Sequence, residues 1–528
     1  MANVVEVFVG LLLAVAALGL AARKLQVPYP VLLVVAGLLF GLIPGLPRVE
    51  LSPEFVFLFF LPPLLFPAAL FTSWRDFHAN LRPILLLAIG LVLFTTVAVG
   101  WLAHYLIPGL PLAAGFVLGA IISPPDAIAA TTIAERLSVP RRIVTILEGE
   151  SLVNDATALV AYRFAVAAVL SNAFSLAEAS SEFIMVSLGG ILVGLAFGWI
   201  VAWFHRQVDD APIEVTVSLL TPFAAYLAAE RLRLSGVLAV VTAGLFLGWR
   251  TPEITNSRTR LQGGPFWEMV EFILNGFVFI LIGLQLPEVL RALPDHSLGQ
   301  LVWYAVVISL AVILIRIGWV FPATYLPRLL IRKIRERDPY PAWQHVTIVA
   351  WTGMRGVVSL AAALALPLTT ETGARFPGRD LILFLTFSVI LATLVIQGLS
   401  LPLLIGWLRI KDDKSAEKEE RLARLKANQA ALAQLTEMYG EEPTKQEPLQ
   451  RLRIEYEDRV RQLEVCTPEN GDEPRRLFGA EYEQLSQEAL RIERKIILQL
   501  RNERVINDHV LRRIQRDIDL AEARLRGR

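Results

Sequence analysis

The chain has 528 residues, of which 55% are hydrophobic, and its mean hydropathy is +0.53. These values are typical of a polytopic membrane protein that carries a soluble appendage. The formal net charge is only +1, which argues against a basic surface that binds nucleic acid.

Apolar stretches of roughly the length that spans a bilayer as a helix, about 20 residues, follow one another along the first 410 residues. They lie near residues 4–22, 28–45, 54–72, 83–107, 111–134, 143–170, 183–204, 213–229, 235–249, 266–290, 299–326, 343–367 and 380–408. The sequence therefore predicts an all-α polytopic membrane protein with about thirteen transmembrane helices.

Two of the predicted helices are interrupted. Ser123-Pro-Pro-Asp126 breaks the fifth, and Thr352-Gly-Met-Arg-Gly356 breaks the twelfth, seven helices later. This offset suggests that helices 1–6 and 8–13 are two inverted-topology repeats whose broken helices cross. Transporters built in this way bind their substrate where the broken helices meet near the bilayer midplane.

The sixth predicted helix carries a polar stripe, in the segment Glu148-Gly-Glu-Ser-Leu-Val-Asn-Asp-Ala-Thr157. Glu150 and Asn154 are four residues apart, as are Ser151 and Asp155, so each pair shares one helix face. Charges inside a membrane are costly and therefore default to a functional interpretation. Asp155 is the first candidate for a carboxylate at which a proton and a small cation compete. Ser151, Asn154 and Thr157 are candidate oxygen ligands for that cation, sodium being the first choice.

The two breaks carry charges of opposite sign. Asp126 follows two prolines that cannot donate backbone hydrogen bonds, and its carboxylate is expected to neutralise positive half-helix ends more than to bind an ion. Arg355 lies in an apolar stretch between two glycines and needs a carboxylate partner, for which Glu150 is the choice. Glu148 is expected to pair at the surface with Arg141 and Arg142, and Arg163 and Arg316 receive no role.

Basic residues gather in alternate loops, for example Arg23, Lys24, Arg141, Arg142 and Arg332. By the positive-inside rule, this distribution predicts a multi-pass protein of the cell membrane with the N-terminus outside and the C-terminus in the cytoplasm.

Charge density changes near Lys411. Residues 1–410 contain 26 Lys/Arg and 24 Asp/Glu, and the much shorter stretch 411–528 contains 24 and 25. The expected domains are therefore a transmembrane domain, 1–410, and a cytoplasmic helical tail, 411–528. Amphipathic helices are expected near 413–439, 447–465 and 476–525, with breaks at 440–444 and 467–474, as a helical domain, a hairpin or a coiled coil.

Familiar catalytic patterns are absent from the sequence. It contains no His-Glu-x-x-His or Gly-x-Ser-x-Gly pattern, no phosphate-binding loop and no dinucleotide fingerprint. We therefore expect a secondary active transporter that is not an enzyme, has no cofactor and is driven by an ion gradient.

Four segments carry a resemblance to a known family: Leu61-Pro-Pro-Leu-Leu-Phe66, Ser123-Pro-Pro-Asp-Ala-Ile-Ala-Ala130, Gly149-Glu-Ser-Leu-Val-Asn-Asp155 and Arg355-Gly-Val-Val-Ser359. With them the chain resembles the cation:proton antiporter family, in its bacterial NhaP-like branch of sodium/proton exchangers. The resemblance implies exchange of sodium or lithium for protons by a homodimer in the lipid bilayer, through elevator-like alternating access.

Residue by residue, the resemblance implies that Asp155 binds the cation and the proton, with Ser151 contributing and Asn154 beside it. An Asn at that position goes with electroneutral one-for-one exchange. It also implies a structural Glu150–Arg355 ion pair and charge balancing by Asp126. Two positions depart from the family: Pro67 stands where many relatives have an acidic residue, and Pro125 stands where a Thr is frequent, leaving only a backbone carbonyl there.

Three alternatives remain open from the sequence. The first is a potassium/proton antiporter of the same fold, the second is a passive cation channel, and the third is a membrane sensor that signals through the tail. The sequence does not identify a regulatory ligand of the tail.

Overall fold

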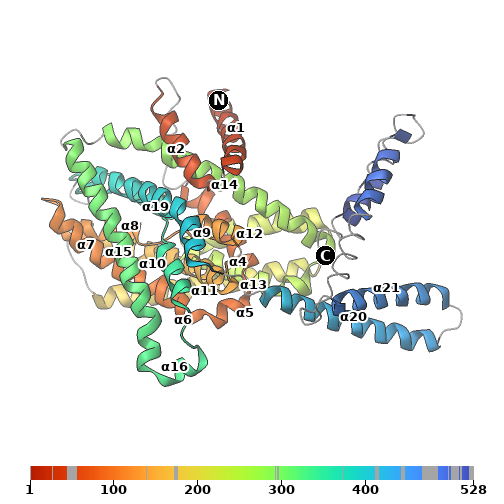
Figure 1. The fold of residues 1–528 in the computed structure, drawn as a ribbon. Coiled ribbons are helices and arrows are strands. Elements are labelled where there is room, and N and C mark those ends of the chain that lie inside the picture. Colours follow the sequence, from red (N-terminus) through yellow and green to blue (C-terminus); the bar gives the residue numbers. More distant parts are fainter. Residues whose placement is uncertain are drawn as a thin grey trace. The chain divides into compact units, whose positions relative to one another are not determined.

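The computed structural model of the chain describes residues 2–25, 28–43, 56–137, 139–171, 176–291, 293, 296–370, 373–410, 415–441, 446–465, 486–497 and shorter stretches between 499 and 522. Throughout these residues the structure is helical and contains no β-strand, only an isolated bridge between Thr369 and Arg375. The predicted all-α class is therefore confirmed (Figure 1).

The helices in the first part of the chain are α1 (Ala2–Leu25), α2 (Tyr29–Gly41), the π-helix η1 (Val56–Phe60), α4 (Leu61–Phe71), α5 (Trp74–Ala79), α6 (Leu81–Leu85), the π-helix η2 (Leu86–Leu91), α7 (Val92–Leu106), α8 (Leu112–Ile122), α9 (Ala127–Arg136) and α10 (Arg141–Ser171). They are followed by α11 (Leu176–His205), α12 (Ala211–Arg231), α13 (Gly236–Ile254), α14 (Ser257–Arg291), α15 (Leu298–Leu330), α16 (Arg332–Arg337), α17 (Trp343–Trp351), α18 (Val357–Leu364) and α19 (Arg379–Leu408).

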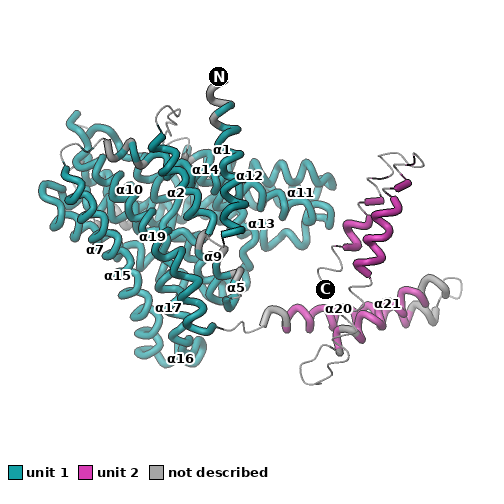
Figure 2. The backbone as a smooth tube through the Cα atoms, turned by 45° about the horizontal axis from the view of Figure 1, so that its top comes forward, with its two compact units in different colours: residues 1–412 teal, residues 413–528 magenta. Residues whose placement is uncertain are grey.

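The chain divides into two compact units, residues 1–412 and 413–528 (Figure 2). The second unit contains α20 (Ser415–Glu441) and α21 (Gln446–Val465), which contact each other through Gln429 and Glu464, and a further helical stretch within 486–497. Most of the expected break at 440–444 and all of that at 467–474 lie outside the described residues. The cytoplasmic place of this unit remains a prediction.

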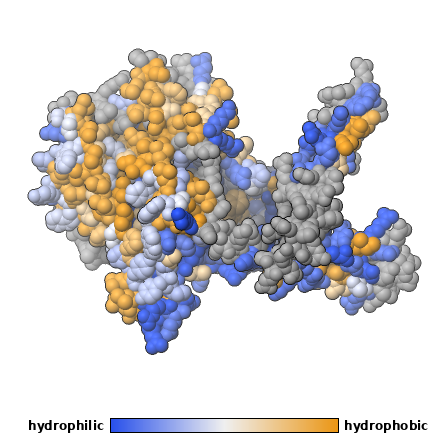
Figure 3. All heavy atoms as spheres, viewed as in Figure 1, coloured by the Kyte–Doolittle hydropathy of each residue, from blue (hydrophilic) through white to orange (hydrophobic). Residues whose placement is uncertain are grey.

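Nine helices of the described chain are long and apolar enough to cross a membrane. Three shorter apolar helices accompany them, at Tyr29–Gly41, Leu58–Phe71 and Leu112–Ile122, so the total of thirteen spans remains a prediction. Hydrophobic residues cover much of the visible face of the first unit (Figure 3). Large apolar side chains are exposed in this unit, and Trp199, Trp303 and Trp407 are each more than half exposed. Such a surface is suited to lipid.

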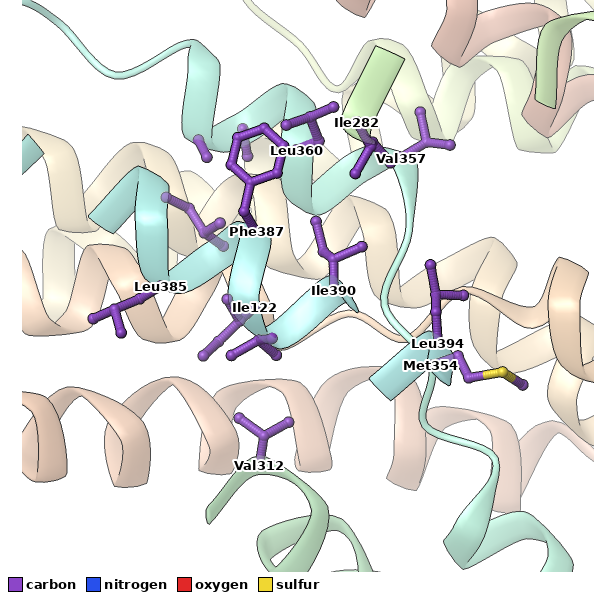
Figure 4. Packing of buried hydrophobic residues seen from close by; sticks show 14 of the residues in the cluster. Ile122, Ile282, Val312, Met354, Val357, Leu360, Leu385, Phe387, Ile390 and Leu394 are labelled. Carbon is purple, nitrogen blue, oxygen red and sulfur yellow. The ribbon is translucent and has the colours of Figure 1, made fainter. Parts of the chain in front are cut away.

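Both predicted helix breaks are present. One helix stops at Ile122 and the next starts at Ala127, and a second pair is separated between Trp351 and Val357. The two extended segments cross, because the backbone N–H of Asp126 donates to the carbonyl oxygen of Met354 at 2.7 Å. Figure 4 shows apolar side chains from α8, α18 and α19 packed around the segment that carries Met354. The crossing is therefore held in the protein interior, where irregular backbone can be tolerated.

Helices α2 and α14 lie side by side with their backbones in close contact (Figures 1 and 2). A Cβ atom on Gly37 would lie 2.2 Å from the carbonyl oxygen of Ile280, and one on Gly283 would lie 2.2 Å from that of Val34. Only glycine permits this approach, and small residues at helix contacts are a common way to pack membrane helices. The contact fixes α14 relative to Tyr29 at the start of α2.

Candidate functional site

The polar stripe of the sixth predicted helix lies on the uninterrupted helix α10. Glu150, Asn154 and Asp155 are buried, with exposed fractions of 1%, 0% and 5%, and Ser151 is half-buried. Because the side chains project from one regular helix, their spacing is fixed. The stripe therefore meets the crossing of the broken helices as a rigid unit.

A cavity of about 410 Å³ opens beside this stripe. Its lining includes five carboxylates and, among the described residues, no Lys, Arg or His: the acidic residues are Asp126, Glu148, Asp155, Glu268 and Glu271. Ser151, Asn275 and Ser359 add neutral oxygen atoms. A cleft lined by one sign of charge with apolar walls concentrates counter-ions, so this cavity suits cations.

Asp155 lies at the wall of the cavity without a counter-charge from the protein. In the part of the chain that the structure describes, its carboxylate forms no ion pair. A buried carboxylate is costly unless it is protonated or paired with a cation. The position therefore favours a group that binds either a proton or an ion from the cavity.

Asn154 fastens α10 to the first break. Its Nδ2 donates to the carbonyl oxygen of Pro125 at 2.9 Å, and it does not line the cavity. Pro125 does line the cavity. The predicted ligand Thr157 is absent from the lining, and its hydroxyl donates to Val153 of its own helix at 3.2 Å. Of the predicted ligands on α10, the structure thus brings Asp155 and Ser151 to the cavity.

The predicted partner of Glu150 is wrong. Arg316 of α15 forms the pair, with Nη1 2.6 Å from Oε1 and Nη2 2.8 Å from Oε2 of Glu150. Both side chains are 1% exposed, and the Nε of Arg316 donates to the carbonyl of Val349 at 3.2 Å. The sequence showed two arginines in apolar stretches, and the fold brings Arg316, not Arg355, into contact with Glu150.

Arg355 instead satisfies the ends of broken helices. Its Nε donates to the carbonyl of Ile122 at 2.9 Å, its Nη2 to that of Ser123 at 3.5 Å, and its Nη1 to that of Gly353. Ile122 ends α8, and helix C-termini carry partial negative charge. Arg355 also interacts electrostatically with Glu150, without a direct ion pair to it.

Asp126 occupies the opposite electrostatic position. It directly precedes α9, and its carboxylate packs on the backbone of Gly356, which precedes α18: a Cβ at Gly356 would lie 1.8 Å from the Oδ2 of Asp126. Helix N-termini carry partial positive charge, so this location supports charge balancing at two helix starts. Asp126 also lines the cavity, where it adds to the negative field.

The basic residues expected to pair with Glu148 have other partners. Arg141 lies 3.1 Å from Asp76, and Arg142 lies 2.8 Å from Asp338. Glu148 lines the cavity instead. The pairing of Glu148 with Arg141 and Arg142 is therefore not found, and Glu148 shares the cavity with Asp155.

The comparison with known proteins agrees with this geometry. A profile of the transmembrane sodium/hydrogen exchanger family matches residues 10–407. The chain belongs to this family. A protein of Mycobacterium tuberculosis, named an uncharacterised Na⁺/H⁺ exchanger, is 38% identical over 98% of this chain and 96% of its own length. A sodium, potassium, lithium and rubidium/H⁺ antiporter of Bacillus pumilus is 37% identical over 72% of this chain and 58% of its own length.

The exchanger fold is also found among solved structures. The sodium proton antiporter MjNhaP1 of Methanocaldococcus jannaschii, at pH 8, matches 76% of this chain and 98% of its own, with a TM-score of 0.59 and 18% sequence identity. The family predicted from the motifs is thus confirmed, and the protein is a multi-span membrane protein of the exchanger family.

The exchanger cavity contains residues that the sequence analysis did not single out. These residues are Glu268, Glu271 and Asn275 of α14, which lie far along the sequence from the motifs of α8 to α10. Their spacing of three and four residues in an apolar stretch was a usable signal. Pro67 of α4 lines the same cavity and supplies no side-chain oxygen.

Proposed function

We propose that this exchanger moves sodium, and lithium, in exchange for protons by binding either ion at Asp155. The observation that carries the proposal is a buried carboxylate that forms no ion pair with the described residues, at the wall of a cavity lined by acids and placed beside the helix breaks. Membership of the sodium/hydrogen exchanger family supports the same activity.

Competition at a single group accounts for coupling. Asp155 holds one proton or one cation, and Ser151 and the carbonyl of Pro125 offer neutral oxygen atoms to a hard cation. Because Asn154 beside it is uncharged and engaged with Pro125, the site exchanges one positive charge for another. Electroneutral one-for-one exchange follows from this arrangement.

Alternating access requires that the site face the two sides of the membrane in turn. The cavity is lined by residues of α10 and the two breaks, and also by residues of α2, α4 and α14. A ligand drives such a cycle by its different affinity for the two states. We propose that movement between these groups of helices, within a homodimer in the cell membrane, carries the ion across.

The test is dissipation of an imposed pH gradient in proteoliposomes by added sodium, comparing the wild type with Asp155→Asn. Glu253→Gln is the matched control, since Glu253 is 62% exposed, pairs with Arg250 and does not line the cavity. We expect sodium to collapse the gradient with the wild type and the control but not with Asp155→Asn. Wild-type exchange by Asp155→Asn would remove Asp155 from the carrier role.

Potassium is the second candidate substrate. The Bacillus pumilus relative is named for sodium, potassium, lithium and rubidium, and the cavity binds through acids that attract any small cation. Repeating the assay with potassium in place of sodium decides this point: a response to potassium at similar concentrations would make the protein a broad monovalent cation/proton antiporter.

A further inference from the structure

Two polar stripes with the same spacing line the cavity. On α10 the stripe is Glu148, Ser151 and Asp155, and on α14 it is Glu268, Glu271 and Asn275. Each set follows the offsets of three and then four residues, which places its members on one face of a helix. Seven residues of helix rise by about 10 Å, so each stripe extends along the cavity and does not mark a single point.

Asn275 is the buried end of the α14 stripe. Its side chain is 2% exposed, and its Oδ1 has no hydrogen-bond partner among the described residues. The same side chain lies close enough to Tyr29 for the two polar groups to interact. A buried oxygen that lines a polar cavity and has no partner calls for a ligand, and amide oxygens are ligands of hard cations.

A second unpartnered oxygen lines the same space. Ser359 of α18 is 1% exposed, and its Oγ has no hydrogen-bond partner in the described part of the structure. The acidic lining is therefore accompanied by two buried oxygen atoms, on different helices, that the protein leaves unsatisfied. Carboxylates alone would attract cations, but these neutral atoms indicate a place where a cation is held.

We propose that Asn275 of α14 is a ligand of the transported cation, in addition to the ligands on α10, and that Glu271 and Glu268 hold the cation on its way there. This inference rests on the proposed exchange function. In this proposal α14 supplies a second set of ligands. Pro67 of α4, which lines the same cavity, has no side-chain oxygen to contribute.

The predicted topology gives this pathway a direction. The sixth and tenth predicted spans, which contain the α10 and α14 stripes, both run outward from the cytoplasmic side. Glu148 and Glu268 then come first along their helices, and Asp155 and Asn275 come last. A cation entering from the cytoplasm meets the acidic residues of both stripes before it reaches Asp155.

The test measures the sodium concentration that gives half-maximal exchange, the KM, together with the maximal rate, for Asn275→Ala and Glu271→Gln. Gln262→Ala is the matched control on α14, since Gln262 is exposed and is not among the residues that line the cavity beside Asp155. We expect Asn275→Ala to raise the KM about fivefold, the effect of one neutral polar contact, with the maximal rate retained. The control is expected to leave both quantities unchanged.

Glu271→Gln has a distinct signature. If Glu271 attracts the cation through its charge, the substitution raises the KM at low ionic strength and has less effect when ionic strength is increased with a non-transported salt. A merely structural contact would not give this salt dependence. Tyr29→Phe tests whether Asn275 acts only through its contact with Tyr29. If it does, Tyr29→Phe should raise the KM as much as Asn275→Ala does.

Asn275→Asp keeps the inference testable if Asn275→Ala does not fold. It retains an oxygen and adds a charge, so the KM should fall below the wild-type value. An unchanged KM in Asn275→Asp and Glu271→Gln, with normal wild-type exchange, overturns the role of α14 alone. Absence of exchange by the wild type overturns the proposed function itself.

Discussion

Three buried charged side chains lie close together, and their charges are balanced in different ways: Glu150, Arg316 and Arg355. Glu150 and Arg316 are joined by two hydrogen bonds, whereas Arg355 is compensated by backbone carbonyls at helix ends. A buried pair adds little net stability, but removing one member leaves an uncompensated charge. The two arginines should therefore differ sharply in how they depend on Glu150.

Arg316→Met is expected to destabilise the protein by about 3–5 kcal/mol, because it leaves the Glu150 carboxylate buried without its partner. Adding Glu150→Gln should recover much of this loss. Thermal unfolding of the purified variants in detergent measures both effects. A double-mutant cycle should give a larger coupling for Glu150 with Arg316 than with Arg355. Equal couplings would contradict the assignment.

Competition at Asp155 predicts how pH acts on transport. Lowering the pH on the side where sodium is added increases the proton occupancy of the site, so the KM for sodium should rise while the maximal rate at saturating sodium stays the same. Initial rates at several sodium concentrations and pH values provide the check. A maximal rate that falls with pH at constant KM would point to a regulatory group outside the site.

At the scale of the elements, the crossing of two broken helices organises the site. Asp126 lies at the starts of α9 and α18, and Arg355 lies at the end of α8, so each charge meets a helix end of opposite sign. The close contact of Asp126 with Gly356 makes the crossing sensitive to a single methyl group.

Gly356→Ala is expected to abolish most exchange. The added Cβ would lie 1.8 Å from Oδ2 and 2.6 Å from Cγ of Asp126, so the whole carboxyl group must move. Gly318→Ala is the control, because a Cβ there meets nothing within 4 Å and alanine favours a helix. Exchange rates in proteoliposomes distinguish them. Normal exchange by Gly356→Ala would show that the position of Asp126 is not critical.

Local sequence signals predicted the helix breaks of the site correctly, but they did not predict which side chains contact one another there. Pro124, Pro125 and the glycines around Arg355 predicted both helix breaks, because these residues restrict or free the backbone locally. The choice of Arg316 over Arg355 depends on helices separated by more than 150 residues, and no local rule fixes it. Asn275 was missed because it belongs to no charged motif, and its importance depends on a cavity shared by distant helices.

At the scale of the molecule, the described residues that line the candidate ion cavity belong to the first of the two units. All residues that line the cavity fall between Tyr29 and Ser359, and the unit boundary lies at residues 412 and 413. The account of exchange at Asp155 therefore rests on residues of the first unit. The tail instead consists of highly charged helices, as expected for a solvated appendage.

Removal of residues 413–528 is expected to leave exchange with a similar KM for sodium, since the ligands remain in place. The measurement is sodium-dependent collapse of a pH gradient by the shortened chain, after its folding has been checked by size-exclusion chromatography. Complete loss of exchange by a well-folded shortened chain would contradict this expectation and would make the tail necessary for transport, whereas the sensor interpretation predicts little exchange by the full chain as well.

Sodium uptake that is driven by an outward proton gradient tests the central claim most directly. Proteoliposomes with an acidic interior should accumulate sodium above its external concentration without generating a membrane voltage, and Asp155→Asn should not accumulate it. Uptake that ignores the proton gradient, or that persists in Asp155→Asn, would contradict coupled exchange at Asp155.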